Sequence, residues 1–141
     1  MSQRTTTRGF SLVELILVVA ILGIISAIAI PQFLGQKRRA QVIGDAQSNA
    51  RVMAMALETR KADNGIYGTA AASYTWTAGV ASDATFLPTV SLTNATKMNF
   101  SILITNGGLG YTLTVNDPAN SDAQVLTLDQ TGTITLSSAY K

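Results

Sequence analysis

The residue types that carry most enzymatic and metal chemistry are missing from this sequence. It has no cysteine and no histidine among its 141 residues. The chain therefore offers no thiol nucleophile, no histidine triad, no disulfide and no cysteine or histidine zinc site. Its acids show no spacing that marks a two-carboxylate catalytic pair or a calcium loop. They are Glu14, Asp45, Glu58, Asp63, Asp83, Asp117, Asp122 and Asp129. The sequence predicts a non-enzymatic protein without a metal or other cofactor.

Two further segments could bind a ligand on composition alone. The glycines at 107, 108 and 110 lie between two alternating apolar runs, which indicates a hairpin turn rather than a phosphate loop leading into a helix. Asp117 to Asp122 could ligate a cation, although a polar turn explains the same residues. The formal net charge of +2 and the scattered basic residues do not favour a direct nucleic-acid site.

Glu14 is the one acid that stands where a charge is costly. It precedes 22 consecutive uncharged residues, Leu15 to Gln36. As a helix rising about 1.5 Å per residue, that run is about 33 Å long, close to the ~30 Å hydrocarbon core of a bilayer. An ionised acid within such a span costs on the order of 2.5–3.5 kcal/mol, so it normally has a partner or a purpose. The run predicts a membrane-spanning helix with a functional acid near its start.

A basic leader carrying Arg4 and Arg8 precedes the apolar run, as it does in a secretory signal peptide. Ala27-Ile28-Ala29 could serve signal peptidase, which would leave Ile30 as the first residue. Against this alternative, the run is longer than the usual signal-peptide core, and such a signal has no use for Glu14. The positive-inside rule is close to a tie, because Lys37, Arg38 and Arg39 follow the span.

The helical pattern continues beyond Pro31 as an amphipathic half. Apolar residues recur at spacings of three and four, at Ala40, Ile43, Ala46, Ala50, Met53 and Leu57. The positions between them predict a solvated face: Arg38, Arg39, Gln41, Asp45, Gln47, Asn49, Arg51, Glu58 and Arg60. The pattern ends at Asn64-Gly65, where glycine can form a left-handed cap. Gly23 and Pro31 interrupt this rod and indicate a kink or a segment that can stretch.

After Gly65 the apolar period changes from helical to alternating. Four runs alternate, around residues 100–104, 111–115, 126–128 and 134–136, and turn residues separate them. They predict a four-stranded antiparallel meander whose buried face packs against the amphipathic half of the helix, an α+β fold. Residues 69–96 read as an irregular loop with at most one short strand. Its Tyr74, Trp76 and Phe86 favour local packing, with a binding surface as the alternative.

The segment Gly9-Phe10-Ser11-Leu12-Val13-Glu14-Leu15 follows a short basic leader and opens an apolar run that ends near Pro31. This arrangement resembles the N-terminal signature of type IV prepilins and their pseudopilin relatives. Asn64-Gly65-Ile66-Tyr67 also resembles the N-G-x-Y of many pilins where the long helix ends, although Gly68 stands where many relatives have proline. Many pilins close their C-terminal region with a disulfide. This chain has no cysteine, so strand pairing alone is expected to hold that region.

The resemblance implies a structural protein processed at its N-terminus. A prepilin peptidase would remove residues 1–9 by cutting between Gly9 and Phe10, and would methylate the new Phe10 amine. Glu14 would recruit the next subunit, and the segment from Gly23 to Pro31 would lose helix on assembly. An inner-membrane assembly platform and its ATPase would then polymerise the subunit. The chain would move from the inner membrane to a surface pilus used for adhesion, twitching motility or DNA uptake.

The resulting organisation has four parts. Residues 1–9 form the leader, 10–36 the transmembrane or filament-core helix, 37–65 its amphipathic half, and 66–141 the globular β domain. A major pilin is the preferred interpretation. A type II secretion pseudopilin and a minor pilin share the same N-terminal half and remain open. A membrane-anchored or exported binding module is a remoter alternative.

Overall fold

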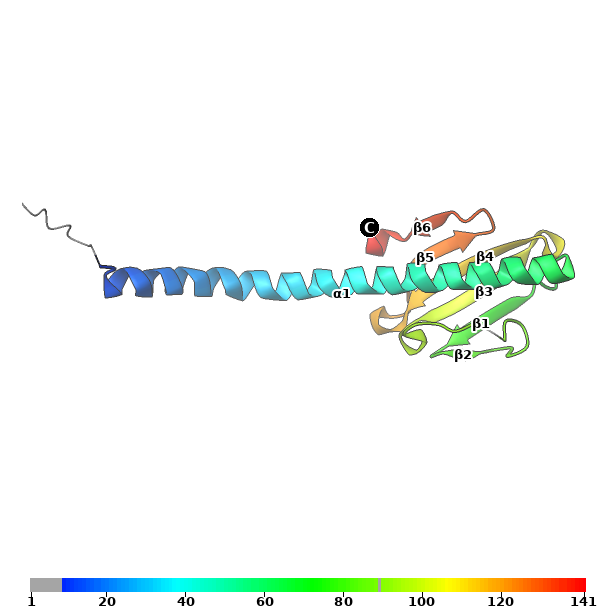
Figure 1. Ribbon diagram of the computed structural model, residues 1–141, viewed down its shortest axis with the longest axis horizontal. Helices are drawn as coiled ribbons and strands as arrows, with labels where there is room; N and C mark the ends of the chain where they lie inside the picture. Colours follow the sequence, from blue (N-terminus) through cyan, green and yellow to red (C-terminus); the bar gives the residue numbers. More distant parts are fainter. Residues whose placement is uncertain (1–8, 89) are drawn as a thin grey trace, which may run out of the picture. The chain divides into compact units, whose positions relative to one another are not determined.

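The structure is a computed structural model that describes residues 9–88 and 90–141. A single long helix, α1 (Leu12–Asn64), precedes six strands, as Figure 1 shows. The strands are β1 (Ser73–Thr77), β2 (Val80–Ala81), β3 (Asn99–Thr105), β4 (Gly110–Asp117), β5 (Ala123–Asp129) and β6 (Ile134–Leu136). The predicted α+β class is therefore confirmed. The chain divides into two units, Met1–Arg38 and Arg39–Lys141, which are described separately below.

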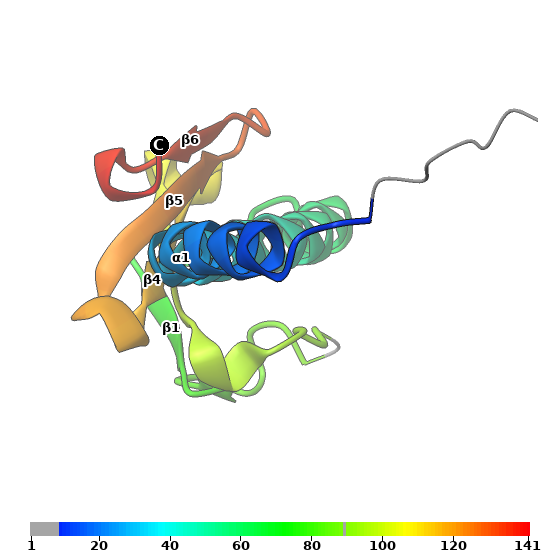
Figure 2. The same ribbon diagram turned by 90° about the vertical axis from the view of Figure 1, so that its left-hand side faces the viewer.

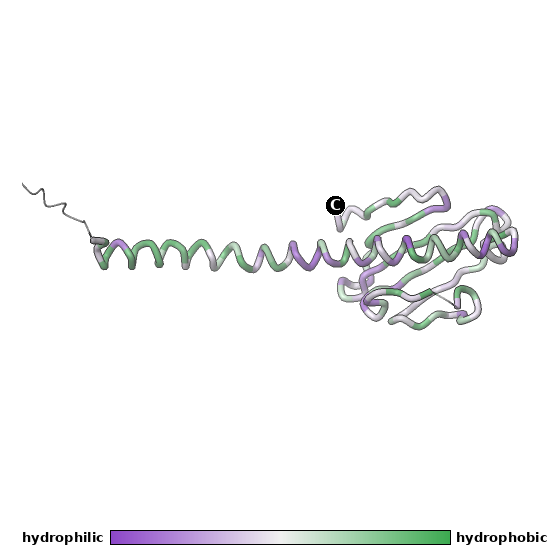
Figure 3. Tube along the Cα trace, in the orientation of Figure 1, coloured by the Kyte–Doolittle hydropathy of each residue, from purple (hydrophilic) through white to green (hydrophobic). Residues whose placement is uncertain are grey.

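The helix α1 ends where the sequence predicts. The Gly65 N–H donates to the Lys61 carbonyl at 2.7 Å, and Gly65 has a φ of 78°, a left-handed conformation that suits glycine. Pro31 lies inside α1, which is helical on both sides of it. Figure 3 shows apolar residues dominating the first half of α1 and mixed residues the second. The secondary structure is thus continuous through a change in composition.

The strands form one antiparallel sheet in the order β2-β1-β3-β4-β5-β6. The four predicted strands are β3 to β6, and the prediction that residues 69–96 hold at most one strand is wrong. β1 pairs with β3, and the two-residue β2 pairs with β1 at the sheet edge. The physical reason is the alternation of Tyr74 and Trp76, which turns both rings toward the core side of the sheet. The same period-two pattern that predicted β3 and β4 is present in β1.

The core lies between one face of the sheet and the second half of α1, as Figure 2 shows end-on. Ala46, Ala50, Met53 and Leu57 of α1 are completely buried. The predicted inward residues of the sheet cover them: Phe100, Ile102, Ile104, Tyr111, Leu113, Val115, Leu126 and Leu128. Two members of the predicted stripe differ, since Ala40 is exposed and Ile43 is only half-buried. The covered stripe of α1 therefore begins near Ala46.

The β3–β4 hairpin also closes one end of the core. Tyr67 N–H donates to the Gly108 carbonyl at 2.8 Å, which brings the segment after α1 against the hairpin. A Cβ at Gly108 would lie 2.6 Å from the Gly68 carbonyl oxygen, so only glycine permits this approach. The glycines at 107 and 108 thus serve the hairpin, as the sequence predicts, and no helix follows them.

Candidate functional site

The candidate site begins at the peptide bond between Gly9 and Phe10. Both residues lie outside regular secondary structure and precede α1, and Phe10 is 79% exposed. A Cβ built at Gly9 would meet no atom within 4 Å. A non-helical, uncovered peptide bond is what a protease requires. The leader residues Arg4 and Arg8 lie outside the described residues.

Ser11 and Glu14 form a capping box at the start of α1. The Ser11 N–H donates to Glu14 Oε2 at 3.0 Å, and the Val13 N–H donates to Ser11 Oγ at 3.3 Å. Two backbone donors that a helix start leaves unsatisfied are thereby bonded. The S-x-x-E spacing in the sequence could have identified this role for Glu14. Both partners follow Phe10, so the box would survive a cut after Gly9.

The apolar half of α1 has no cover within the described chain. Its large apolar side chains from Leu12 to Leu34 are between 48% and 72% exposed. The helix is long and apolar enough to cross a membrane. Burying an exposed aliphatic or aromatic side chain of this kind is worth roughly 1.5–3 kcal/mol. Such a surface is stable only when lipid or other protein covers it.

Gly23 and Pro31 both lie within this uncovered half. No atom comes within 4 Å of a Cβ built at Gly23, so packing does not explain the glycine there. Pro31 removes one backbone donor from the helical hydrogen-bond ladder. The weakening that these residues predict is compatible with the continuous helix of a single chain. Helix loss on assembly stays a prediction.

Three consecutive cations follow the uncharged run at the boundary between the two units. Lys37 and Arg38 close the first unit and are exposed. Arg39 opens the second unit, where its guanidinium donates to the Ala139 carbonyl and lies over the Tyr140 ring, 5.9 Å from its centroid. The three cations thus have different surroundings, although the sequence presents them as one group.

Polar side chains of α1 hold the irregular loop of residues 69–96 by hydrogen bonds. The sequence pattern assigns these side chains to the solvated face. Asn49 is 1% exposed, so its predicted place on the solvated face is wrong. Its amide donates to the Thr93 carbonyl at 2.7 Å and accepts from the Thr93 N–H at 2.9 Å. Asp45 accepts from the Asn94 side chain at 2.8 Å. Asn49 is buried because both of its polar groups find backbone partners.

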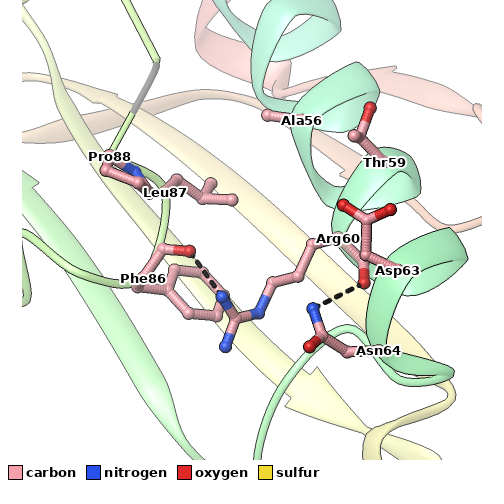
Figure 4. A pocket seen from close by; sticks show the side chains of 8 residues that line it. All are labelled: Ala56, Thr59, Arg60, Asp63, Asn64, Phe86, Leu87 and Pro88. Carbon is pink, nitrogen blue, oxygen red and sulfur yellow. Dashed lines mark hydrogen bonds between the residues drawn. The ribbon is translucent and has the colours of Figure 1, made fainter.

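Arg60 is a second polar residue that turns toward the loop (Figure 4). Its guanidinium donates to the carbonyls of Tyr67 and Phe86 at 3.0 and 2.9 Å and lies 4.8 Å from the centre of the Phe86 ring. The pocket of about 250 Å³ beside it is lined by Ala56, Thr59, Arg60, Asp63, Asn64, Phe86, Leu87 and Pro88. Arg60 holds the loop against α1 through two carbonyls and a ring. The pocket beside it is therefore interpreted as part of this structural contact and not as a ligand site.

The loop aromatics pack inside the globular unit. Trp76 and Phe86 are 5% and 2% exposed, and Tyr74 stacks on Phe86 with ring centres 3.4 Å apart. Tyr67 donates to Glu58 Oε1 at 2.7 Å. Burial, reinforced by this hydrogen bond and by the Glu58 charge, raises the pKa of Tyr67 to about 12. Burial likewise raises the pKa of Tyr111, whose ring meets Tyr67 edge-on.

The C-terminus is held by more than strand pairing, which corrects the expectation from the missing disulfide. Tyr140 donates its hydroxyl to Asp117 Oδ2 at 2.8 Å, and Asp117 is 5% exposed. The other oxygen of Asp117 accepts from the Ala119 N–H at 2.9 Å. Asp122 accepts from Asn99 and Asn116 side chains. The residues from 117 to 122 therefore form a polar turn, and within the described chain no group of three acids is placed to hold a metal.

Comparison with known proteins finds a family model near the N-terminus and several relatives that match part of the chain. The family model described as the prokaryotic N-terminal methylation motif matches residues 4–30. Over 65 residues the chain is 38% identical to type II secretion system core protein G of Pseudomonas aeruginosa, covering 46% of this chain and 45% of that protein. Over 70 residues it is 41% identical to type IV major fimbrial protein FimA of Dichelobacter nodosus, covering 46% and 43%.

A fimbrial protein of Pseudomonas aeruginosa is 57% identical over 35 residues, covering 25% of this chain and 23% of that protein. The chain thus spans less than half the length of the curated relatives it matches. No solved structure gives a significant match. The residues that the family model matches include Gly9, Phe10, Glu14 and Gly23.

Proposed function

This chain is a type IV pilin-like protein, and from that premise we propose that it is the major subunit of a type IV pilus. The observation that carries the proposal is the exposed apolar half of α1 in a chain whose globular unit has a core of its own. A membrane covers that surface before assembly. The same surface of neighbouring copies covers it in the filament.

Processing is the first step of the proposed pathway. Prepilin peptidase cuts between Gly9 and Phe10 and methylates the Phe10 amine. The exposed, non-helical bond before α1 supports this assignment. Residues 10–36 remain on the mature chain as the inner-membrane span, in contrast to a signal peptide cut before Ile30.

Recruitment of the next subunit is assigned to Glu14. Its capping bond uses Oε2, and Oε1 remains an acceptor for a second partner. The amine that cleavage creates on Phe10 of a neighbouring copy is a suitable cation. Two opposite charges in an apolar setting lower the cost of burying each other. The residues from Gly23 to Pro31 then allow α1 to lose helix as subunits rise past one another.

The proposed partners follow from this pathway. They are further copies of the chain, prepilin peptidase, and the inner-membrane assembly platform with its ATPase. The function is structural, at the inner membrane first and then in a pilus on the cell surface. Adhesion, twitching motility and DNA uptake are the roles such a pilus would serve.

A type II secretion pseudopilin is the second candidate, favoured by the 38% identity to core protein G over 65 residues. A minor pilin would share the same N-terminal half. These alternatives differ from a major pilin in how much of a surface filament the chain forms. Abundance in shed filaments therefore discriminates between them.

The test is to shear filaments from cells and analyse them by mass spectrometry. A major pilin is expected to be the main component and to begin with methylated Phe10. Gly9→Val should block cleavage, whereas Gly9→Ala serves as the tolerated control. A mature chain that begins at Ile30 would establish the signal-peptide alternative. A correctly processed chain that is absent from surface filaments would favour the pseudopilin.

A further inference from the structure

Lys37 and Arg38 form a cationic collar, named here for these two residues, at the end of the uncharged run. Between Glu14 and Asp45 the sequence contains no other acid. Asp45 is engaged by Asn94 in the globular unit. The collar therefore has no acid within the six residues on either side of it along α1. Its positive charge is not balanced locally.

The surroundings of the collar distinguish it from Arg39. Arg39 binds the Ala139 carbonyl and lies over Tyr140. Within the part of the chain that the structure describes, neither Lys37 nor Arg38 has a side-chain hydrogen bond or ion pair. Both residues are exposed. They are available to a partner outside the chain.

The position of the collar along α1 indicates what that partner is. From Glu14 to Lys37 the helix rises about 35 Å, at about 1.5 Å per residue, and the hydrocarbon core it would cross is ~30 Å thick. When Glu14 lies at one membrane surface, Lys37 and Arg38 lie at the headgroups of the other. Successive residues also point about 100° apart around a helix. The two side chains of the collar therefore point to different headgroups around α1.

We propose that Lys37 and Arg38 bind the phosphate groups of anionic phospholipids and hold the unassembled subunit at a defined depth in the membrane. This inference rests on the proposed function only in requiring that residues 10–36 span a bilayer. The long stems of lysine and arginine reach from the apolar boundary to the headgroup layer while keeping the charge hydrated. Assembly must then break these contacts when the subunit leaves the membrane.

The experiment uses the full chain reconstituted in phosphatidylcholine vesicles with a trace of spin-labelled lipid. Electron paramagnetic resonance measures the relative association of labelled phosphatidylglycerol and labelled phosphatidylcholine with the inserted helix. Each cation near a membrane surface is worth about a fivefold preference for anionic lipid, so labelled phosphatidylglycerol should be favoured about fivefold at each of the two headgroup positions at low salt. At about 1 M salt, where the Debye length is ~3 Å, the preference should fall several-fold.

The decisive variant is K37Q/R38Q, and its matched control is R51Q/K97Q. The control removes two exposed positive charges from the globular unit and leaves the collar intact. Loss of the phosphatidylglycerol preference in K37Q/R38Q, with retention in R51Q/K97Q, supports the proposal. Retention in K37Q/R38Q, or equal loss in both variants, overturns it.

Two further results separate this inference from others. If inorganic phosphate displaces labelled phosphatidylglycerol more than chloride does at the same ionic strength, the collar is a free-anion site and the lipid assignment is wrong. A chain that forms pili but shows no lipid preference overturns this inference and leaves the proposed function standing. A chain with the lipid preference that forms no surface filament supports the inference and contradicts the major-pilin proposal.

Discussion

The two halves of α1 share one secondary structure and differ in what covers their apolar side chains. Leu22 in the first half is 56% exposed, and Leu57 in the second half is completely buried. The sheet of the same chain covers Leu57, and nothing in the described chain covers Leu22. The comparison separates two uses of an apolar helix. One half completes the core of the globular unit, and the other leaves its apolar side chains exposed.

The difference also shows how polar residues divide between the two halves. In the second half Asn49 and Arg60 bond to backbone groups of the loop, so polar contacts add specificity to an apolar core. In the first half the polar contact is local: Glu14 accepts a hydrogen bond from the Ser11 N–H and caps the start of the helix. Substitutions in the first half should therefore affect assembly, and substitutions in the second half should affect folding.

The largest effect is expected from Glu14. Glu14→Val should reduce the filament yield steeply, since leaving a buried charge without its partner costs about 3–5 kcal/mol. Glu14→Gln keeps an oxygen for the capping box but loses the charge. Equal loss of sheared filaments in both variants assigns the effect to the charge. Cleavage after Gly9 and unfolding of the globular unit should not change.

A different pattern at Glu14 would revise its role. Normal filaments with Glu14→Gln and few with Glu14→Val would assign the residue to helix capping. Normal filaments with both variants would end the recruitment proposal. Failure to cleave after Gly9 would move the role of Glu14 to the peptidase step.

The paired substitutions Leu57→Ala and Leu22→Ala test the comparison directly. Leu57→Ala should lower the free energy of unfolding of the globular unit by about 2–5 kcal/mol, because it leaves a cavity in the core. Leu22→Ala should change it by less than about 0.5 kcal/mol, because no core residue contacts it. Urea unfolding followed by the single Trp76 measures both. An equal loss of unfolding free energy in both variants would show that both halves of α1 contribute to the stability of the globular unit.

The C-terminal contact predicts a smaller effect on folding. Tyr140→Phe removes the donor to the buried Asp117 carboxylate and should lower the free energy of unfolding by about 1–3 kcal/mol. Tyr74→Phe is the matched control, because its ring would keep the stack on Phe86. Thermal unfolding of the two variants compares them. A Tyr140→Phe variant as stable as wild type would show that the hydrogen bond from Tyr140 to Asp117 does not stabilise the globular unit.

The smallest effect is a pH dependence confined to the globular unit. The pKa of Tyr67 rises from 10.0 to about 12 on folding, so the folded chain keeps a proton that the unfolded chain releases. This contribution to stability is fully present below pH 10.0 and is lost as the pH rises toward about 12. The stability difference between wild type and Tyr67→Phe should therefore shrink over that interval. Parallel pH profiles would contradict the assignment to Tyr67.

Much of the fold follows from local spacing in the sequence. Spacings of three and four predicted that Met53 and Leu57 face the core, and alternation predicted the same for Ile102 and Leu113. The end of α1 at Asn64 was predicted from the glycine that follows it. These predictions succeed because each depends on residues a few positions apart, where backbone geometry alone decides which side chains share a face.

The N-terminal signature is equally local. Gly9, Phe10 and Glu14 were identified from their order and spacing, and the methylation-motif model covers the same residues. The capping role of Glu14 was also readable from Ser11, three residues before it. For this half of the chain, the sequence contains the pattern because the hydrogen-bond partners that the structure shows, Ser11 and Glu14, are only three residues apart.

The polar contacts of the globular unit could not be read in this way. The hydrogen-bond partners are far apart in the sequence. Asn49 and Thr93 are separated by 44 residues, Arg60 and Phe86 by 26, and Tyr140 and Asp117 by 23. Helical spacing assigns Asn49 and Arg60 to solvent, because a polar side chain is stable in the interior only when a partner meets its donors and acceptors. That partner arrives only when the sheet and its loop fold onto α1. The sequence by itself therefore determines which apolar side chains face the core. Only the tertiary structure decides which polar side chains are buried, because it brings their partners to them.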